Sequence, residues 1–316
     1  MPTSTRTNIF CGTILLVAVS GFSQPRPPDS RDGSSRSGKS AATNEVSIRI
    51  SGAYRLITAN GIPDHPPGQF PNRGNPHQIY PQRYSFRVSM KPKVNERASP
   101  SSLGVTFGIA LNGVPFNPSA AEFWRGDRNW QYEAKDGAIN LGLDEHNAHV
   151  QPGGEYHYHA MPMGLARKLY QEDSIVLVGY AADGFPIYAR FGFEDPMDLT
   201  SGNKILRSSY QLKKGERPNG PDGKFDGTYV QDYEYVKGSG DLDECNGRFG
   251  VTPEYPKGIY HYYITDSFPF LSRSFRGTPD ASFGRRGGPG GTGGRRPQLR
   301  NRTGGGRPPS KGGRPR

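Results

Sequence analysis

The chain has 316 residues, with 43 Gly, 29 Pro, two Cys and a formal net charge of +11. The charge is unevenly placed, because residues 281–316 hold ten basic and no acidic residues whereas residues 41–280 hold 25 basic and 27 acidic ones. The central region is therefore near neutral, which argues against a folded domain that binds nucleic acid through a broad positive face. The presence of only two cysteines excludes a disulfide-dense scaffold and a four-cysteine zinc site.

Residues 1–23 are predicted to be a secretory signal peptide. Arg6 gives a positive start, residues 14–19 form the centre of a short apolar run, and small residues allow cleavage after Ser20 or Ser23. The run is too short to span a bilayer comfortably, and no other stretch approaches the length of a membrane helix. We therefore expect a secreted, periplasmic or cell-surface protein with no transmembrane span after cleavage; an uncleaved anchor is the alternative.

Two segments have a composition typical of disorder. Residues 24–43 are rich in Pro, Ser, Arg and Gly, and residues 284–316 repeat Gly, Arg and Pro with Leu299 as the only aliphatic side chain. Such segments cannot bury enough apolar surface to offset the entropy lost on ordering. The composition predicts a disordered linker, a folded domain at residues 44–283 and a disordered basic tail.

Apolar residues alternate with polar ones along much of this domain, which favours β-strands. Asn-Gly, Asp-Gly and Pro-Gly steps lie between the alternating segments and are typical of turns. Helix signals are few, at residues 118–124 and 165–170. We predict a mostly β domain, a sandwich or barrel of antiparallel sheets with a few short helices. The expected strands lie at residues 46–50, 84–90, 105–110, 174–180 and 229–235.

Histidines are concentrated in one short segment. Four of the seven, His146, His149, His157 and His159, fall within 14 positions. Since alternate residues of a strand share a face, His157 and His159 should point the same way. The intervening Gln-Pro-Gly-Gly turn would fold His149 back against that pair, as in a hairpin.

Three neutral imidazoles with a carboxylate or water would suit a divalent transition metal, Zn²⁺, Cu²⁺, Fe²⁺ or Mn²⁺. Asp144, Glu145 and Glu155 lie close enough in sequence to hold the second ring nitrogens of the ligands. The alternative is a structural role, in which the histidines and the neighbouring tyrosines stack and hydrogen-bond along the strand.

Several motifs resemble those of the YHYH-domain family. The signature is Tyr156-His157-Tyr158-His159, and the resemblance extends over roughly residues 100–280. It implies a domain of unknown function found mostly in exported proteins, without a substrate or catalytic assignment to carry over. The further matching motifs lie at residues 148–152, 179–188, 240–248 and 252–256.

The chain departs from this family at one position. Members often carry a second cysteine where Ser274 is expected here, so removal of Cys11 with a signal peptide would leave Cys245 as the single thiol. A buried thiol that acts as a small apolar side chain is favoured over a catalytic one.

Residues 152–159 recur in outline at residues 256–263, where His261 aligns with His157 and Tyr263 with His159. We hypothesise that the two segments are adjacent strands of one sheet and that His261 is a fourth metal ligand. Chance similarity in a tyrosine-rich chain is the alternative.

Two acidic features complete the candidate sites. Asp183, followed by glycine after an apolar strand, indicates a turn, although its carboxylate could also serve the histidine site. The acidic segment 222–244 could hold Ca²⁺, but Lys224 stands where a calcium loop needs an oxygen ligand, which excludes an EF-hand. Acidic loops paired with Lys213, Lys214 and Arg217 are the alternative.

Three classes of function remain. The first is a metal-dependent domain. If it is an enzyme, we expect a hydrolase or oxidoreductase in which the metal ion activates water or oxygen and Glu155 or Asp183 acts as the base. The second is a cell-surface or matrix-binding module without catalytic activity. The third is nucleic-acid binding through the Arg-Gly tail. The predicted signal peptide argues against this function, and we expect the tail to bind anionic surface polymers instead.

Overall fold

The computed structural model describes residues 42–135 and 138–284. The predictions of a signal peptide, of a disordered linker as far as residue 41 and of a disordered basic tail from residue 285 lie outside these residues. Within the described ranges, no helix has both the length and the apolar character needed to cross a bilayer.

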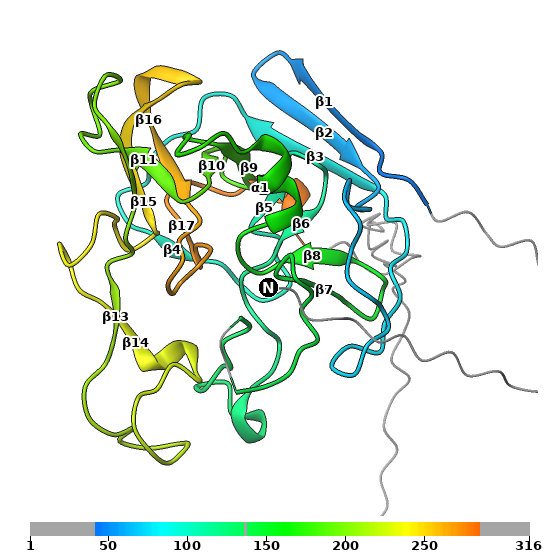
Figure 1. The fold of residues 1–316 in the computed structure, drawn as a ribbon, viewed down its shortest axis with the longest axis vertical. Coiled ribbons are helices and arrows are strands. Elements are labelled where there is room, and N and C mark those ends of the chain that lie inside the picture. Colours follow the sequence, from blue (N-terminus) through cyan, green and yellow to red (C-terminus); the bar gives the residue numbers. More distant parts are fainter. Residues whose placement is uncertain (1–41, 136–137, 285–316) are drawn as a thin grey trace, which may run out of the picture. The chain divides into compact units, whose positions relative to one another are not determined.

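A three-stranded antiparallel meander opens the described domain, formed by β1 (Val46–Ser51), β2 (Tyr54–Ala59) and β3 (Tyr84–Ser89) (Figure 1). Side chains alternate along β2 and β3, so that Ile57, Phe86 and Val88 are buried on one face. This is the period-two pattern expected of a sheet with one face on the core.

The second sheet has eight strands and carries the histidines. It is mixed, because β10 pairs in parallel with β16 and β6 with β8, whereas its other neighbours are antiparallel. In spatial order its strands are β15 (Gly247–Thr252), β16 (Tyr255–Tyr263), β10 (Pro186–Tyr188), β9 (Leu177–Ala181), β5 (Gly108–Ala110), β6 (Pro115–Phe116), β8 (Tyr156–Tyr158) and β7 (Ala148–Val150).

Short elements surround these sheets. Three two-stranded pairs join β11 (Phe191–Phe193) to β12 (Asn203–Ile205), β13 (Tyr210–Leu212) to β14 (Tyr233–Tyr235), and β17 (Ser274–Phe275) to β4 (Ser99–Pro100). The α-helix is α1 (Met163–Leu169), and the 3₁₀ turns are η1 (Trp124–Gly126), η2 (Val230–Asp232) and η3 (Ala281–Phe283).

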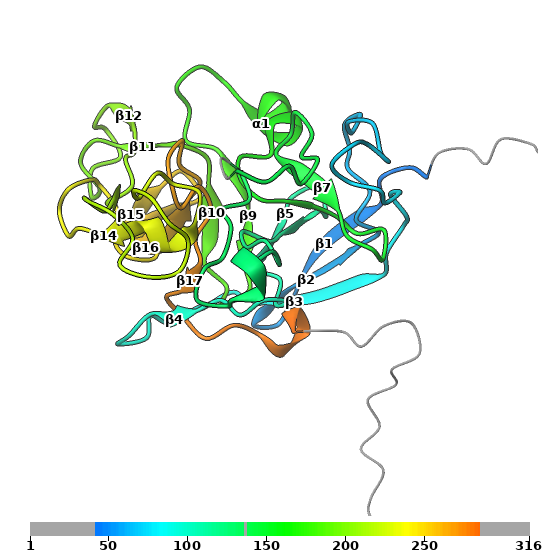
Figure 2. The ribbon, with the colours of Figure 1, turned by 90° about the horizontal axis from the view of Figure 1, so that it is seen from below.

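Figure 2 shows the meander beside the eight-stranded sheet, and the main core cluster contains buried side chains from both. Phe86 of the meander stacks on Phe283 with ring centroids 4.3 Å apart, and Phe107 stacks on Phe275 at 5.0 Å. Burying one such side chain stabilises the fold by about 1.5–3 kcal/mol. The prediction of a mostly β domain with antiparallel sheets and few helices is confirmed, and the parallel strand pairs of the larger sheet are an addition to it.

The element predictions differ in accuracy. Strands at residues 46–50 and 84–90 and the helix at 165–170 are confirmed. The predicted strands at 105–110 and 174–180 are shortened to β5 and β9, and half of 229–235 forms η2 instead of a strand. The helix at 118–124 is wrong, because its backbone pairs with distant residues: Trp124 N–H donates to the Trp130 carbonyl and Tyr132 N–H to the Glu122 carbonyl.

Candidate metal centre

A tight hairpin builds the histidine site, as predicted. His149 on β7 lies directly opposite His157 on β8, and Val150 opposite Tyr156. The Gln151 N–H donates to the Glu155 carbonyl and closes the turn. Beyond the end of β8, the His159 N–H donates to the carbonyl of Asn147, which lies in the left-handed region at φ 57°.

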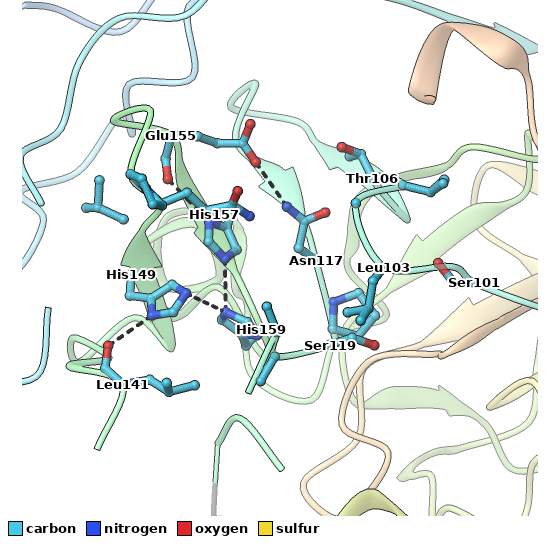
Figure 3. Close-up of a pocket in the computed structure, with 18 of the residues that line it drawn as sticks. Ser101, Leu103, Thr106, Asn117, Ser119, Leu141, His149, Glu155, His157 and His159 are labelled. Atoms are coloured by element: carbon cyan, nitrogen blue, oxygen red, sulfur yellow. Dashed lines mark hydrogen bonds between the residues drawn. The ribbon is translucent and has the colours of Figure 1, made fainter. Parts of the chain in front are cut away.

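The three imidazole rings converge on one point (Figure 3). Nε2 of His159 lies 3.0 Å from Nε2 of His157 and 3.1 Å from Nε2 of His149. Each pair of ring centroids is 4.7 Å apart, so the rings surround their common point evenly. Among the described residues, this is the group of histidine, cysteine and carboxylate side chains that could share a metal ion.

Backbone carbonyls hold the opposite side of two of these rings. Nδ1 of His149 lies 2.9 Å from the Leu141 carbonyl, and Nδ1 of His157 lies 3.3 Å from the Glu155 carbonyl. Since a carbonyl only accepts, these contacts assign the ring proton to Nδ1 and leave Nε2 with a free lone pair. The third ring, that of His159, has the Pro118 carbonyl as a nearby acceptor, at a geometry too poor for a regular hydrogen bond.

Burial keeps the three rings neutral. Desolvation lowers the pKa of His149, and it lowers the pKa of His157 well below the ordinary value with a further contribution from His149. The pKa of His159 is also well below its ordinary value, first through desolvation and then through the two neighbouring histidines. Neutral imidazole is the form that binds metals.

Without a cation, the convergence of the nitrogens is unfavourable. Two Nε2 atoms have no proton, and a single hydrogen on Nε2 of His159 can be directed well at one of them only. The other contact would bring two lone pairs together in a desolvated site. Two nitrogens bound to one Zn²⁺ at about 2.0–2.1 Å with tetrahedral angles lie about 3.3 Å apart, which is close to the observed spacing.

The histidines line a cavity of about 1130 Å³. Glu155 lies in the same lining, and its carboxylate accepts a 3.0 Å hydrogen bond from Asn117 (Figure 3). Burial raises the pKa of Glu155. The contacts of Asn117 and of the Leu141 carbonyl with this site were not predicted from the sequence. Both residues lie outside the hairpin in sequence, and no local pattern indicates that they contact it.

The tyrosines of the signature occupy the opposite face of β8. Tyr156 donates to Asp144 at 2.7 Å, and Asp144 also accepts the backbone N–H groups of His146, Ala148 and Gly68. The hydroxyl of Tyr158 accepts from Asn112 and lies 2.7 Å from Nε2 of His65. These contacts hold β8 on the face opposite the histidines. Asp144 therefore supports the strand and does not hold the second ring nitrogen of a ligand histidine.

His261 is not a fourth ligand. β16 and β8 belong to one sheet, but four strands separate them, so the prediction of adjacent strands is wrong. Five strand spacings of about 4.8 Å place them about 24 Å apart. Both ring nitrogens of His261 are used locally, by the Ile259 carbonyl and the Tyr263 hydroxyl at 2.8 Å each.

The structure does not bring Asp183 to the histidines either. Asp183 lies in the turn between β9 and β10, where its carboxylate accepts from the Tyr262 hydroxyl and from the Gly277 N–H at 2.8 Å. It is not among the residues that line the cavity. Turn formation, the other role considered for it, accounts for its position.

Among the described residues, the carboxylates of the acidic segment 222–244 do not converge closely enough to share a calcium ion. Its side chains pair instead with cations, Asp226 and Asp232 with Arg217, Asp241 with Lys204, and Glu244 with Arg276. Cys245 is buried and unpaired, and desolvation raises the pKa of its thiol, as expected for a structural rather than a nucleophilic cysteine.

We expect Gly154→Ala to loosen the histidine hairpin. Gly154 has φ +82°, and an added Cβ would lie 2.5 Å from the Tyr80 ring. Strain and overlap together should lower the free energy of unfolding by about 1–3 kcal/mol. Urea unfolding measures this change, and Gly153→Ala, where a Cβ meets open space, is the matched control. Equal effects at the two positions would contradict this account of the turn.

Comparison with known proteins identifies the family of the chain. A family model described as YHYH protein matches residues 85–277, and the chain belongs to this family. The match includes the hairpin and all three converging histidines. Searches of curated proteins and of solved structures each found no match.

Proposed function

We propose that this is an exported metalloprotein that binds one divalent transition metal ion through His149, His157 and His159. The observation that carries the proposal is the convergence of three neutral imidazoles, of which those of His157 and His159 are buried and that of His149 is half-buried, with two of the rings oriented by backbone carbonyls. Zn²⁺, Cu²⁺, Fe²⁺ and Mn²⁺ all accept imidazole ligands. The signal-like residues 1–23 support the export part of the proposal.

The position of the histidines on a cavity wall favours a reactive centre over a purely structural one. Structural zinc sites are closed by four protein ligands, whereas catalytic sites keep three and leave a position open. An ion held here would supply Lewis acidity or an activated water, which fits a metal-dependent hydrolase or oxidoreductase. Glu155 is the carboxylate that we propose to carry a proton to or from that position, because it belongs to the same lining.

Elemental analysis of the purified protein tests the metal site. We expect about one transition metal ion per chain in the wild type and almost none in His157→Ala/His159→Ala. His261→Gln is the matched control, because it removes a buried histidine outside the group and should keep the metal. Wild-type protein without stoichiometric metal after reconstitution would defeat the proposal.

A further inference from the structure

The histidine cavity is large and rich in hydroxyl groups. At about 1130 Å³, it exceeds the range of about 300–1,000 Å³ typical of small-molecule pockets, so a ligand of several units would fit it. The polar side chains of its lining are mostly uncharged hydroxyls and amides. They include Ser101, Ser102, Thr106, Asn117, Ser119 and Ser282.

The charge of the lining favours an anionic ligand. Three neutral imidazoles leave the charge of a divalent ion uncompensated, and Arg128 adds another positive charge. The acidic side chains of the lining are Glu122 and Glu155, which offset two of these three charges at most. A loaded cavity therefore keeps a net positive charge at a position where a carboxylate could complete the coordination of the metal.

An arginine and an aromatic ring lie together in the same lining. The Arg128 guanidinium lies 5.6 Å from the centroid of the Phe123 ring, and Arg128 is exposed whereas Phe123 is half-buried. The contact with the ring holds the guanidinium at the cavity wall, where its N–H groups can donate to a carboxylate.

We propose that the cavity binds a short oligosaccharide of uronic acids. Carboxylates of this ligand would bind the metal ion and Arg128, and its hydroxyl groups would hydrogen-bond to the Ser, Thr and Asn side chains of the lining. This proposal rests on the proposed metal function. A hydroxyl-bearing ligand is favoured over an acidic peptide, because the lining presents hydroxyl partners along its length.

Calorimetric titration of the zinc-loaded, full-length protein with tetragalacturonic acid tests this inference, with no free zinc present. The fully methyl-esterified tetramer is the matched control ligand, since it keeps the rings and loses the charges. We expect the acid to bind at least tenfold more tightly than the ester. Arg128→Ala should weaken acid binding about tenfold while the zinc content stays unchanged, because Arg128 is not a ligand of the histidine site.

The possible outcomes separate this inference from the metal proposal. Equal binding of acid and ester, or tighter binding of a tetraglutamate peptide, would overturn the uronic-acid assignment and leave the metal site standing. Failure to load zinc would defeat the metal proposal and with it the contact between a ligand carboxylate and the ion. Acid binding that still depends on Arg128 would then support only the contact between the ligand and Arg128.

Discussion

Asp232→Ala is expected to lower the free energy of unfolding by about 3–5 kcal/mol. The Asp232 side chain is fully buried and accepts from Nε and Nη2 of Arg217 at 2.8 and 2.6 Å. It also accepts the backbone N–H groups of Gly227 and Tyr229. Its removal would leave the buried Arg217 side chain with Asp226 and the Asp222 carbonyl, and the N–H groups of Asp226, Gly227 and Tyr229 without this acceptor.

Urea unfolding of wild type and variant measures this loss. Glu234→Ala is the control, because Glu234 is an exposed carboxylate on the adjacent β14 and its removal should change stability by less than about 0.5 kcal/mol. An Asp232→Ala loss below about 1 kcal/mol would mean that the buried ion pair does not hold this part of the domain together.

Asp183 is expected to make the domain less stable as the pH rises from about 4 to about 6. Desolvation raises the pKa of this buried carboxyl to about 6, despite hydrogen bonds from Tyr262 and Gly277. The folded state therefore keeps a proton that the unfolded state has already lost above pH 4, so its stabilising effect is complete at low pH and is lost as the pH passes 6. A shift of about two pKa units corresponds to about 3 kcal/mol.

The difference between wild type and Asp183→Asn isolates this contribution, because other carboxyl groups titrate in both proteins. Unfolding by urea at several pH values, in the presence of a chelator, should show the advantage of the wild type falling by about 3 kcal/mol between pH 4 and pH 7. Parallel stability curves for the two proteins would show that the buried carboxyl does not titrate in this range.

Much of the histidine site could be predicted from the sequence, because its geometry is local. Period-two alternation placed His157 and His159 on one face, and the turn residues between positions 150 and 155 brought His149 opposite them. The division of the signature into a histidine face and a tyrosine face follows from the same alternation.

Long-range pairing could not be predicted in this way. The similarity around His261 is real in the sequence, but local patterns do not encode strand order, and four strands lie between the two segments. The segment 118–124 has helix-like residues, yet its backbone is bonded to residues 130 and 132. In this second segment, tertiary contacts outweigh intrinsic helix propensity.

X-ray absorption spectroscopy of the zinc-loaded protein identifies the ligands of the proposed metal ion. We expect three imidazole nitrogens at about 2.0–2.1 Å together with ligands that are not supplied by the protein. In His159→Ala the imidazole scattering should fall by a third or be lost with the metal. A coordination shell without three histidines, or a shell closed by four protein side chains, would contradict a metal centre that is open to the cavity.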